Sequence, residues 1–361
     1  MDNSIRITAL QAYLITLLSI GLMNHVELIP VLLSLAKRDA WAGAMLTVIP
    51  ACLFAPLVAY VARKTRDVNL VATIRTRFGR FAAWAIGGMV SLYAFLSLIV
   101  TLKDTSNWAH IAYLPNTPVI AIAFVLTVLC ACSAQAGIRA IAICSGLLLP
   151  IVAILGLFVM SANFQHKDYS LLFPLFTHGF KPLGNAAFIA LSGITELVLL
   201  LFLQHHLKTP MRARGLLLVT VLLIGLTVGP LAGAIAIFGP FEAADLRYPA
   251  FEQWRMVTLG RFVTHLDAFS IFQWLSGAFI RISFLMFLIL DLPSGRSVRT
   301  RRFVLVLLLI AIGLVFLAVP INDILLYRLL QTVIPYISIL FGAMLLVVLA
   351  IMARFGKLQS Q

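Results

Sequence analysis

The chain has 361 residues, of which 62% are apolar and only 11% are Asp, Glu, Lys or Arg, whereas about a quarter of the residues in a soluble domain are charged. Together with a mean hydropathy of +1.05, this composition excludes a soluble protein and predicts an all-α polytopic membrane protein whose single domain covers residues 1–361. The net charge of +14 also occurs in nucleic-acid-binding proteins, so the positions of the basic residues decide whether that class is excluded.

Ten segments are long and apolar enough to cross a membrane as helices, which takes about 20 residues each. We expect them at residues 8–35, 40–62, 82–106, 117–134, 138–161, 183–204, 214–238, 268–291, 303–320 and 331–353. The even number places both termini on one side. Most of the 27 lysines and arginines fall in the segments on that side, which indicates cytoplasmic termini. The positive charge therefore reflects topology, and nucleic-acid binding is excluded.

Two connections between spans combine apolar and charged residues. Residues 63–80 place apolar side chains among basic ones, as in an amphipathic helix that lies on an anionic lipid bilayer. The outer connection, residues 239–267, predicts a surface helix or lid. Its apolar residues stand between charged ones and are Tyr248, Phe251, Trp254, Leu259 and Phe262.

The first span contains residues that weaken a continuous apolar helix. Gly21 tolerates unusual backbone angles, Pro30 removes a backbone donor, and Asn24 can bond the backbone groups that are freed. His25 and Glu27 add ionisable groups, which are costly in hydrocarbon unless they are paired or hydrated. Glu27 stands near the outer end of the span, where we expect it to reach interfacial water.

The sixth span has a comparable interruption, which consists of Ser192, Gly193, Ile194, Thr195 and Glu196. If the ten helices form two repeats of five, roughly residues 8–161 and 183–353, the first and sixth helices correspond. Interrupted helices at corresponding positions are typical of a transporter's binding site, because backbone groups at membrane depth are tolerated where they line a cavity. Helix N-termini there would bind a carboxylate, and free carbonyls an ammonium group. The alternative is that Gly and Pro occur in these helices without unwinding them.

The eighth span carries the one base that we place inside the membrane. Trp274, Gly277 and Arg281 recur at helical spacing and form one stripe. Gly277 would admit a neighbouring backbone, and Arg281, which cannot lose its proton, needs an acid or carbonyl groups. Glu196 is the natural partner. The pair is either part of a functional site or an ion pair that only holds two helices together.

Polar residues of the third span point to the same cavity. Tyr93, Ser97 and Thr101 share a face at i+4 spacing and either line the cavity or bond to neighbouring helices. His205 and His206 close the sixth span at a helix C-terminus, where cations are favoured. We interpret these two histidines as interfacial residues and not as metal ligands. The sequence contains no hydrolase, metalloprotease or ATP-binding motif, which favours a protein that is not an enzyme and needs no cofactor or metal.

One stretch has a more specific pattern. It contains Tyr248-Pro249, Arg255, Leu259-Gly260-Arg261-Phe262, Leu266-Asp267-Ala268 and Trp274-Leu275-Ser276-Gly277-Ala278-Phe279-Ile280-Arg281-Ile282-Ser283. Further matches are Ile20-Gly21, Arg38-Asp39-Ala40-Trp41 and Gly193 to Glu196. In these residues the chain resembles the endospore germination permeases, the membrane-embedded B subunits of Ger-type germinant receptors, within the amino acid-polyamine-organocation superfamily. The resemblance covers essentially the full length.

The resemblance implies a LeuT-like fold with a 5+5 inverted repeat and broken first and sixth helices. It also implies that a germinant binds between the first, third, sixth and eighth helices, and that A and C subunits assemble with the chain in the spore inner membrane. Three departures from the family pattern concern the site. The first break keeps one glycine, Gly21, of a Gly-x-Gly; Arg281 replaces a lysine; and Leu203-Gln204 replaces a proline after the acid of the sixth helix.

The preferred functional hypothesis is a germinant receptor subunit that binds a small nutrient, an amino acid, and shifts a conformational equilibrium that partner subunits detect. The candidate ligand-binding residues are Gly21, Asn24, His25, Tyr93, Ser97, Ser192, Gly193, Thr195, Glu196, Trp274 and Gly277, with Glu196 and Arg281 as a charge pair. The alternative is a proton-coupled amino acid transporter in which Glu196 carries the proton. A structural or channel subunit without saturable ligand binding is a third hypothesis.

Overall fold

The computed structural model describes residues 6–177, 179–258, 266–292, 298–318 and 322–355. Within these ranges the protein is built of helices, with one isolated bridge between Ile7 and Leu207. Nine helical stretches of the described part are long and apolar enough to span a membrane. The first, Ala9–Lys64, has 56 residues, more than twice the about 20 that one crossing needs. It supplies the first two predicted spans, so the ten predicted crossings are accounted for.

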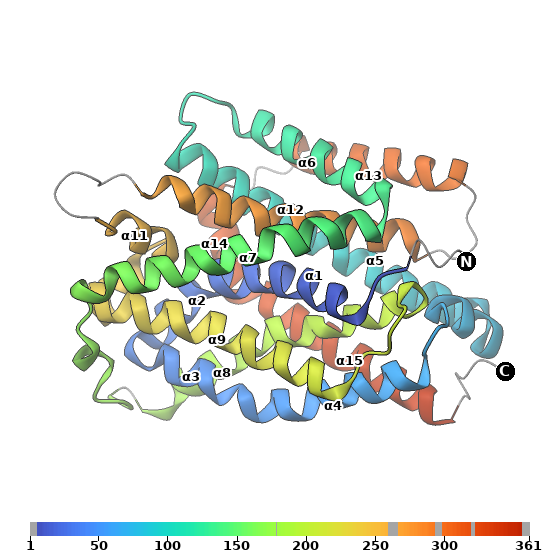
Figure 1. Cartoon of the computed structure of the whole chain (residues 1–361), viewed down its shortest axis with the longest axis horizontal. Helices are drawn as coiled ribbons and strands as arrows, with labels where there is room; N and C mark the ends of the chain where they lie inside the picture. Colours follow the sequence, from blue (N-terminus) through green and yellow to red (C-terminus); the bar gives the residue numbers. More distant parts are fainter. Residues whose placement is uncertain (1–5, 178, 259–265, 293–297, 319–321, 356–361) are drawn as a thin grey trace.

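The first stretch reverses direction in its middle, as Figure 1 shows in blue. Its first half consists of α1 (Ala9–Leu22), the π-helical segment η1 (Met23–Glu27) and α2 (Leu28–Ala36); its second half consists of a 3₁₀ turn, η2 (Lys37–Asp39), α3 (Ala40–Leu46) and α4 (Val48–Lys64). Lys37 has a φ of 47°. Because a right-handed helix cannot continue through a positive φ, the chain turns back at this residue.

The amphipathic segment predicted within residues 63–80 forms the first part of α5 (Leu70–Ala112). In this part Leu70 and Ile74 are buried, whereas Arg75 and Arg77 are exposed, so the apolar and basic faces are present. The helix then bends at Gly79, whose φ of 89° is readily available to glycine. Beyond the bend, α5 continues as the third span.

The remaining long spans are α6 (Val119–Ala136), α7 (Ile138–Ala162), α8 (Phe180–Thr195) with its 3₁₀ continuation η5 (Glu196–His206), α9 (Ala213–Phe238), α12 (Ala268–Asp291), α13 (Val298–Ala318) and α15 (Ile334–Phe355). Shorter elements are η3 (Asn163–His166), η4 (Tyr169–Leu172), α10 (Pro240–Asp245), α11 (Pro249–Arg255) and α14 (Asp323–Thr332). The last two residues predicted for the ninth span, 319 and 320, lie outside the described residues. The division into two repeats, 8–161 and 183–353, stays a prediction.

A surface helix or lid was predicted for residues 239–267, and the described residues of this connection, 239–258 and 266–267, do not form a single surface helix. They form the two short helices α10 and α11, and Trp254 is only 2% exposed. Tyr248 and Trp254 are therefore buried in the end of the helix bundle, which removes apolar area from water, whereas Phe241 is 59% exposed. Leu259 and Phe262 lie outside the described residues.

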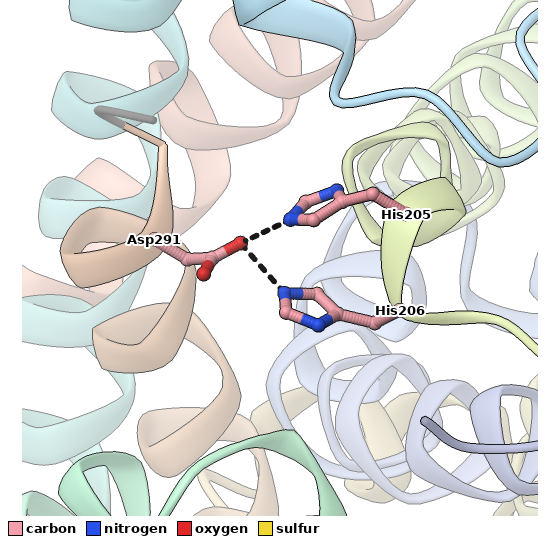
Figure 2. Close-up of side chains that lie close together, drawn as sticks. All are labelled: His205, His206 and Asp291. Atoms are coloured by element: carbon pink, nitrogen blue, oxygen red, sulfur yellow. Dashed lines mark hydrogen bonds and ion pairs between the residues drawn. The ribbon is translucent and has the colours of Figure 1, made fainter. Parts of the chain in front are cut away.

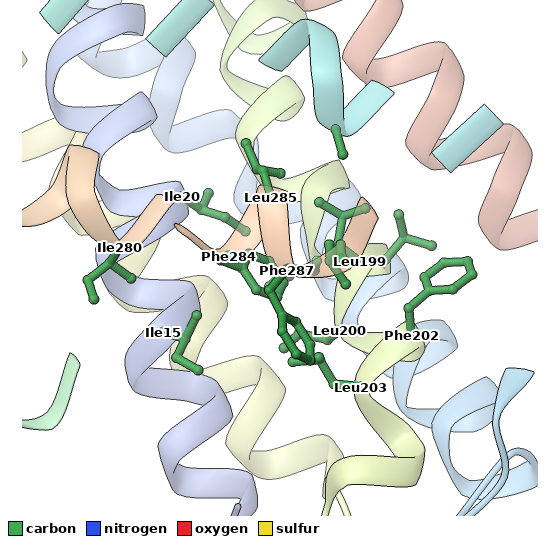
Figure 3. Close-up of a cluster of buried hydrophobic side chains, with 14 of the residues drawn as sticks. Ile15, Ile20, Leu199, Leu200, Phe202, Leu203, Ile280, Phe284, Leu285 and Phe287 are labelled. Carbon is green, nitrogen blue, oxygen red and sulfur yellow. The ribbon is translucent and has the colours of Figure 1, made fainter. Parts of the chain in front are cut away.

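The sixth and eighth spans form the centre of the bundle. In the most apolar stretch of the sixth span 83% of the residues are buried, and in that of the eighth span 78% are buried. The corresponding share is 17% in the spans formed by α7 and by α13. Figure 3 shows the buried apolar cluster where α1, η5 and α12 meet. Its labelled members are Ile15, Ile20, Leu199, Leu200, Phe202, Leu203, Ile280, Phe284, Leu285 and Phe287. The outer helices expose apolar side chains, as a lipid-facing surface requires.

Candidate functional site

A buried ion pair joins the sixth and eighth spans where α8 passes into η5. Arg281 donates two hydrogen bonds to the carboxylate of Glu196, from Nη1 to Oε2 at 2.7 Å and from Nη2 to Oε1 at 2.8 Å. The side chains are 2% and 1% exposed. The structure thus brings together the acid and the base that the sequence suggested as partners. They form the bidentate pair that guanidinium and carboxylate groups favour.

Hydroxyl groups of α5 extend this pair on both sides. Tyr93 donates to Oε1 of Glu196 at 2.5 Å. Thr101 accepts from Nε of Arg281 at 3.0 Å and donates to Oε1 of Glu27 at 2.8 Å. Glu27 is 3% exposed, so the expectation that it reaches interfacial water was wrong. A continuous polar network therefore runs from the first span through the third and eighth spans to the sixth.

The network contains two carboxyl groups and one guanidinium. Arg281 also donates to the Ser19 carbonyl oxygen at 3.3 Å and lies 3.6 Å from the sulfur of Met23, so each of its nitrogens has a partner. The two acids do not each have a base. When both Glu27 and Glu196 are ionised, one buried negative charge is uncompensated, which is costly in a low-dielectric interior. The site therefore favours a proton or a cationic ligand group.

The interruptions of the first and sixth spans touch each other. Asn24 in η1 lies against Gly193 in α8, where a Cβ atom would be only 1.8 Å from Oδ1 of Asn24 and 2.8 Å from its Cγ. Nδ2 of Asn24 donates to the Leu223 carbonyl at 3.3 Å. Its Oδ1 is buried and accepts no hydrogen bond from any described residue. An unpaired buried acceptor costs about 1–3 kcal/mol, so it offers a position for a ligand donor.

Both interruptions are changes of helix type. The first is a π-helical turn in which the Leu28 amide donates to the Met23 carbonyl; the second is the switch from α8 to the 3₁₀ segment η5 at Glu196. Their predicted positions are confirmed. The unwound backbone expected there is not found, because the chain keeps hydrogen bonds within each segment. Such π-turns and 3₁₀ stretches are frequent at functional sites and hinges.

Several predicted ligand-binding groups already have partners in this state. The hydroxyl of Ser192 donates to a carbonyl of its own helix at 2.7 Å, and that of Thr195 donates to the Ser192 carbonyl at 2.8 Å. The indole nitrogen of Trp274 donates to Thr105 at 3.2 Å, and its ring stacks on Trp108 with centroids 4.0 Å apart. In this arrangement Ser192 and Thr195 can offer a ligand only an acceptor oxygen, because their hydroxyl protons are already donated.

The remaining predicted residues differ in their surroundings. Gly277 lets α12 approach α1, since a Cβ there would be 3.0 Å from the Cβ of Leu22. Gly21 faces α9, where its Cβ would be 3.3 Å from a side-chain carbon. Ser97 is buried on the face of α5 that carries the hydroxyl network. His25 has its Nδ1 buried without a hydrogen-bond partner among the described residues.

The site is closed in this structure. The cavity that touches Glu196 has a volume of about 10 Å³ and is enclosed by α1, η5 and α12, which is room for about one water molecule. A groove of about 640 Å³ between α7 and α12 is lined mainly by apolar residues and does not include Glu196. A nutrient can therefore bind beside the ion pair only if the helices move apart.

The end of the bundle that carries α11 and α14, termed the distal end, is closed by an arginine that bridges two acids. Arg247 donates to Asp104 of α5 at 2.6 Å and to both oxygens of Asp323, at 3.1 and 3.2 Å. Its guanidinium lies over the rings of Tyr248 and Tyr327, 4.4 and 5.0 Å from their centroids. We call this cluster the distal clamp. It connects the third span to the N-terminus of α14.

Within the distal clamp, Arg247 stays charged and Tyr248 stays neutral over the physiological pH range. Burial by itself lowers the pKa of Arg247, but the carboxylates of Asp104 and Asp323 outweigh it and hold that pKa above its ordinary value. Burial, followed by the charge of Asp104, raises the pKa of the Tyr248 hydroxyl above its usual range. Opening of this end thus requires movement and not a change of protonation in Arg247 or Tyr248.

The opposite end, where α1 begins and α15 ends, is termed the terminal end (Figure 1). There the segment before α1 pairs with the chain that leaves η5. The Ile7 amide donates to the His206 carbonyl at 2.9 Å, and the Lys208 amide donates to the Ile7 carbonyl at 2.7 Å. Thr209 accepts from the Ala9 amide at 2.8 Å. Hydrogen bonds between segments that are distant in the sequence are therefore present at both ends of the bundle.

The sequence interpretation missed the distal clamp. Asp104 falls within the predicted third span, residues 82–106, but was not named among its polar residues, although it continues the stripe of Tyr93, Ser97 and Thr101 by three residues. Extending that stripe at helical spacing would have placed Asp104 on the buried face of the third span, where it is 1% exposed. Arg247 and its second acid could not have been found in this way, because they come from separate connections.

Replacing Arg247 with glutamine is expected to open the distal end, because it leaves Asp104 buried without a positive partner. In a background without Cys52, Cys130, Cys132 and Cys144, a cysteine introduced as Ser97→Cys should react with a hydrophilic thiol reagent at least about tenfold faster, which corresponds to ~1.4 kcal/mol. Arg255→Gln is the matched control, because Arg255 is 60% exposed in its pair with Glu252 and such pairs contribute little. Equal labelling rates in the two variants would contradict the role of the clamp.

Comparisons with known proteins place these observations in a family. The family model described as spore germination protein matches residues 7–324. Spore germination protein XB of Bacillus anthracis is 39% identical over 341 residues, which are 93% of this chain and 96% of that protein. The putative spore germination protein YfkT of Bacillus subtilis (strain 168) is 23% identical over 272 residues, which are 74% of this chain and 72% of that protein.

The fold is similar to that of Mhp1, a nucleobase-cation-symport-1 family transporter solved in a closed conformation with bromovinylhydantoin bound. The TM-score is 0.61 over 95% of this chain and 78% of the transporter chain, at 12% sequence identity. The all-helical architecture is thus a LeuT-like transporter fold, as expected. Together with the family match over most of the chain, these findings show that the protein belongs to the spore germination permeases of the Spore_permease family.

Proposed function

We propose that this protein is the B subunit of a spore germinant receptor and binds a small nutrient, an amino acid, where the first and sixth spans touch. The observation that carries the proposal is the unpaired Oδ1 of Asn24, buried against Gly193. A buried acceptor without a partner at the contact of two irregular helices is a position that a ligand donor can complete. The family membership supports a role in germination.

The charges of the polar network support an amino acid as the nutrient. Glu27 and Glu196 share the single base Arg281 through Thr101, so the site has an excess of negative charge that suits an ammonium group. Nutrient binding would separate the helices that now leave room for only about one water. The ligand shifts the equilibrium by binding the open state more tightly than the closed one.

The proposal includes partners and a location. The receptor A and C subunits would detect the conformational change, and the chain would lie in the spore inner membrane with its termini in the cytoplasm. The basic residues of the terminal end and of the first part of α5 support this orientation, because cytoplasmic segments of membrane proteins are enriched in Lys and Arg.

Spores that carry Asn24→Ala are expected to need about tenfold more nutrient for half-maximal germination rate, because one hydrogen bond of ~1.4 kcal/mol is lost. The maximal rate at saturating nutrient should be retained. The control is Thr127→Val, which changes a buried polar residue of α6 outside the site. An unchanged nutrient dependence in the Asn24 variant would overturn the proposed binding position.

A proton-coupled amino acid transporter is the second candidate. It is favoured by one observation, the surplus carboxyl group in a closed network, since a buried acid without its own base can take up and release a proton. Proteoliposomes that contain this chain alone separate the two functions. Uptake of labelled amino acid driven by a proton gradient would favour transport, whereas nutrient-dependent ion flux only in the presence of A and C subunits would favour the receptor.

A further inference from the structure

Two histidines and an aspartate meet at the terminal end, away from the polar network. His205 and His206 are the last residues of η5, and Asp291 is the last residue of α12. Figure 2 shows both imidazole rings directed at the same carboxylate oxygen. Each Nε2 lies 2.9 Å from Oδ2 of Asp291, and the three ligand atoms lie within 4.8 Å of one another.

This convergence is not a result of helix geometry. Successive residues of a 3₁₀ helix point about 120° apart, so two adjacent side chains reach one oxygen only if both rings turn toward it. The chain leaves the helix at Leu207, and the two rings pack with centroids 4.0 Å apart. The ring of His206 also meets the edge of Phe287. The two imidazole groups are thus held side by side by their packing.

In place of the interpretation of the two histidines drawn from the sequence, we propose that His205, His206 and Asp291 bind a divalent transition-metal ion, with Zn²⁺ as the best fit. Two imidazole nitrogens and a carboxylate oxygen are a common ligand set for Zn²⁺, which binds each at about 2.0–2.2 Å. In a tetrahedral site, ligand atoms at this distance from the metal are roughly 3.4 Å apart. The two Nε2–Oδ2 distances of 2.9 Å have to widen by about half an ångström, and the distance between the two Nε2 atoms, which is at most 4.8 Å, has to settle near the same value.

The surroundings allow a cation to enter and to complete its coordination. The side chains of His205, His206 and Asp291 are 12%, 7% and 19% exposed, so water can supply a fourth ligand. The site lies at the C-terminal ends of two helical segments, where the helix dipole favours positive charge. Asn69, whose Nδ2 is 3.4 Å from Nε2 of His205, would be displaced slightly.

One nearby positive charge would repel a metal cation and weaken its binding. The guanidinium of Arg301 lies over the ring of Phe287, 5.6 Å from its centroid, and donates to the Ala134 carbonyl at 2.9 Å. The carboxylate of Asp291 offsets one charge of the metal directly. A bound metal would tie the end of the sixth span to the end of the eighth span. This inference does not depend on the proposed nutrient site, because the two sites have no residue in common.

The experiment measures metal binding by the full chain, purified in detergent through an affinity tag without histidines. After treatment with a chelator, the protein is titrated with ZnCl₂ and the bound zinc is counted by elemental analysis. The wild type is expected to bind one equivalent. Co²⁺ in place of Zn²⁺ should give the visible absorption of a four-coordinate site with nitrogen and oxygen ligands.

The variants distinguish a metal site from a hydrogen-bonded cluster. Asp291→Asn keeps an oxygen that can accept hydrogen bonds from both rings but removes the negatively charged ligand. Loss of a residue that only hydrogen-bonds to a metal ligand lowers metal affinity by roughly 10–100-fold. The loss of zinc affinity in Asp291→Asn should therefore be larger than that. His205→Ala/His206→Ala should abolish binding. The control is His166→Ala, which changes an exposed histidine outside the cluster and should bind like the wild type.

Two results would overturn the proposal. The first is a wild-type protein that retains no stoichiometric zinc, and the second is equal zinc binding by the wild type and Asp291→Asn. Gel filtration of each variant shows whether it is folded. If the double histidine variant aggregates, the near-isosteric Asp291→Asn variant alone decides the question.

Discussion

Arg281→Met is expected to lower the free energy of unfolding by about 3–5 kcal/mol, the usual cost of removing one partner of a buried ion pair. The variant leaves the carboxylate of Glu196 in a site where that side chain is 1% exposed, with Tyr93 as its remaining donor. Thr101 also loses its contact with Arg281. Chemical or thermal unfolding of the purified chain in detergent, followed by circular dichroism, measures the loss.

The double variant Glu196→Gln/Arg281→Met provides the internal control. Removing both charges avoids an unpaired carboxylate at position 196, although Glu27 loses its base in both variants, so the double variant should be more stable than Arg281→Met alone. Arg281→Lys should fall between the wild type and Arg281→Met, because lysine keeps the charge but not the two-pronged geometry. If Arg281→Met and the wild type unfold together, the pair does not stabilise the closed state.

Gly193→Ala is expected to impair nutrient-triggered germination strongly, and Gly193→Leu is expected to abolish it. A Cβ at this position would lie 1.8 Å from Oδ1 of Asn24, which is not a permitted contact, so the first and sixth spans must separate or Asn24 must move. The protein should still reach the membrane, because the change affects one contact inside a large bundle. Germination rates and the amount of the protein in spore membranes measure the two effects.

Gly184→Ala is the matched control for this substitution. Gly184 belongs to the same helix, α8, and a Cβ there meets nothing within 4 Å. A rescue variant sharpens the test, since Asn24→Ala removes the atoms that collide with the new methyl group. Gly193→Ala combined with Asn24→Ala should therefore recover more activity than Gly193→Ala alone. Normal germination of the Gly193→Leu spores would contradict the proposed site.

Sequence reasoning identified the ion pair for a physical reason. A charged side chain in the membrane needs a partner, and Arg281 and Glu196 were the base and the most deeply placed acid of the spans. The same argument cannot show how the acid is oriented or which hydroxyl groups complete it. Tyr93 and Thr101 were recognised as a stripe, but their bonds to different carboxylates depend on the packing of three helices.

The helix types were not predictable from the sequence. Asn24 and Pro30 in the first span and Gly193 in the sixth indicate that a regular α-helix is disfavoured, but the same residues are compatible with an unwound turn, a π-turn or a 3₁₀ segment. The choice depends on which geometry lets Asn24 lie against Gly193 while neighbouring backbone groups stay bonded. That is a tertiary constraint, and the local sequence does not contain it.

The 3₁₀ form of η5 gives the sixth span a length that depends on its helix type. Its 11 residues extend about 22 Å at the 2.0 Å rise of a 3₁₀ helix, but only about 16.5 Å at the 1.5 Å rise of an α-helix. Rewinding this segment as α-helix would draw its two ends together by roughly 5 Å and turn one against the other by about 220°. A change in the hydrogen-bonding pattern of η5 near Glu196 would thus shift and rotate the far end of the sixth span. Whole repeats would not have to move as rigid bodies.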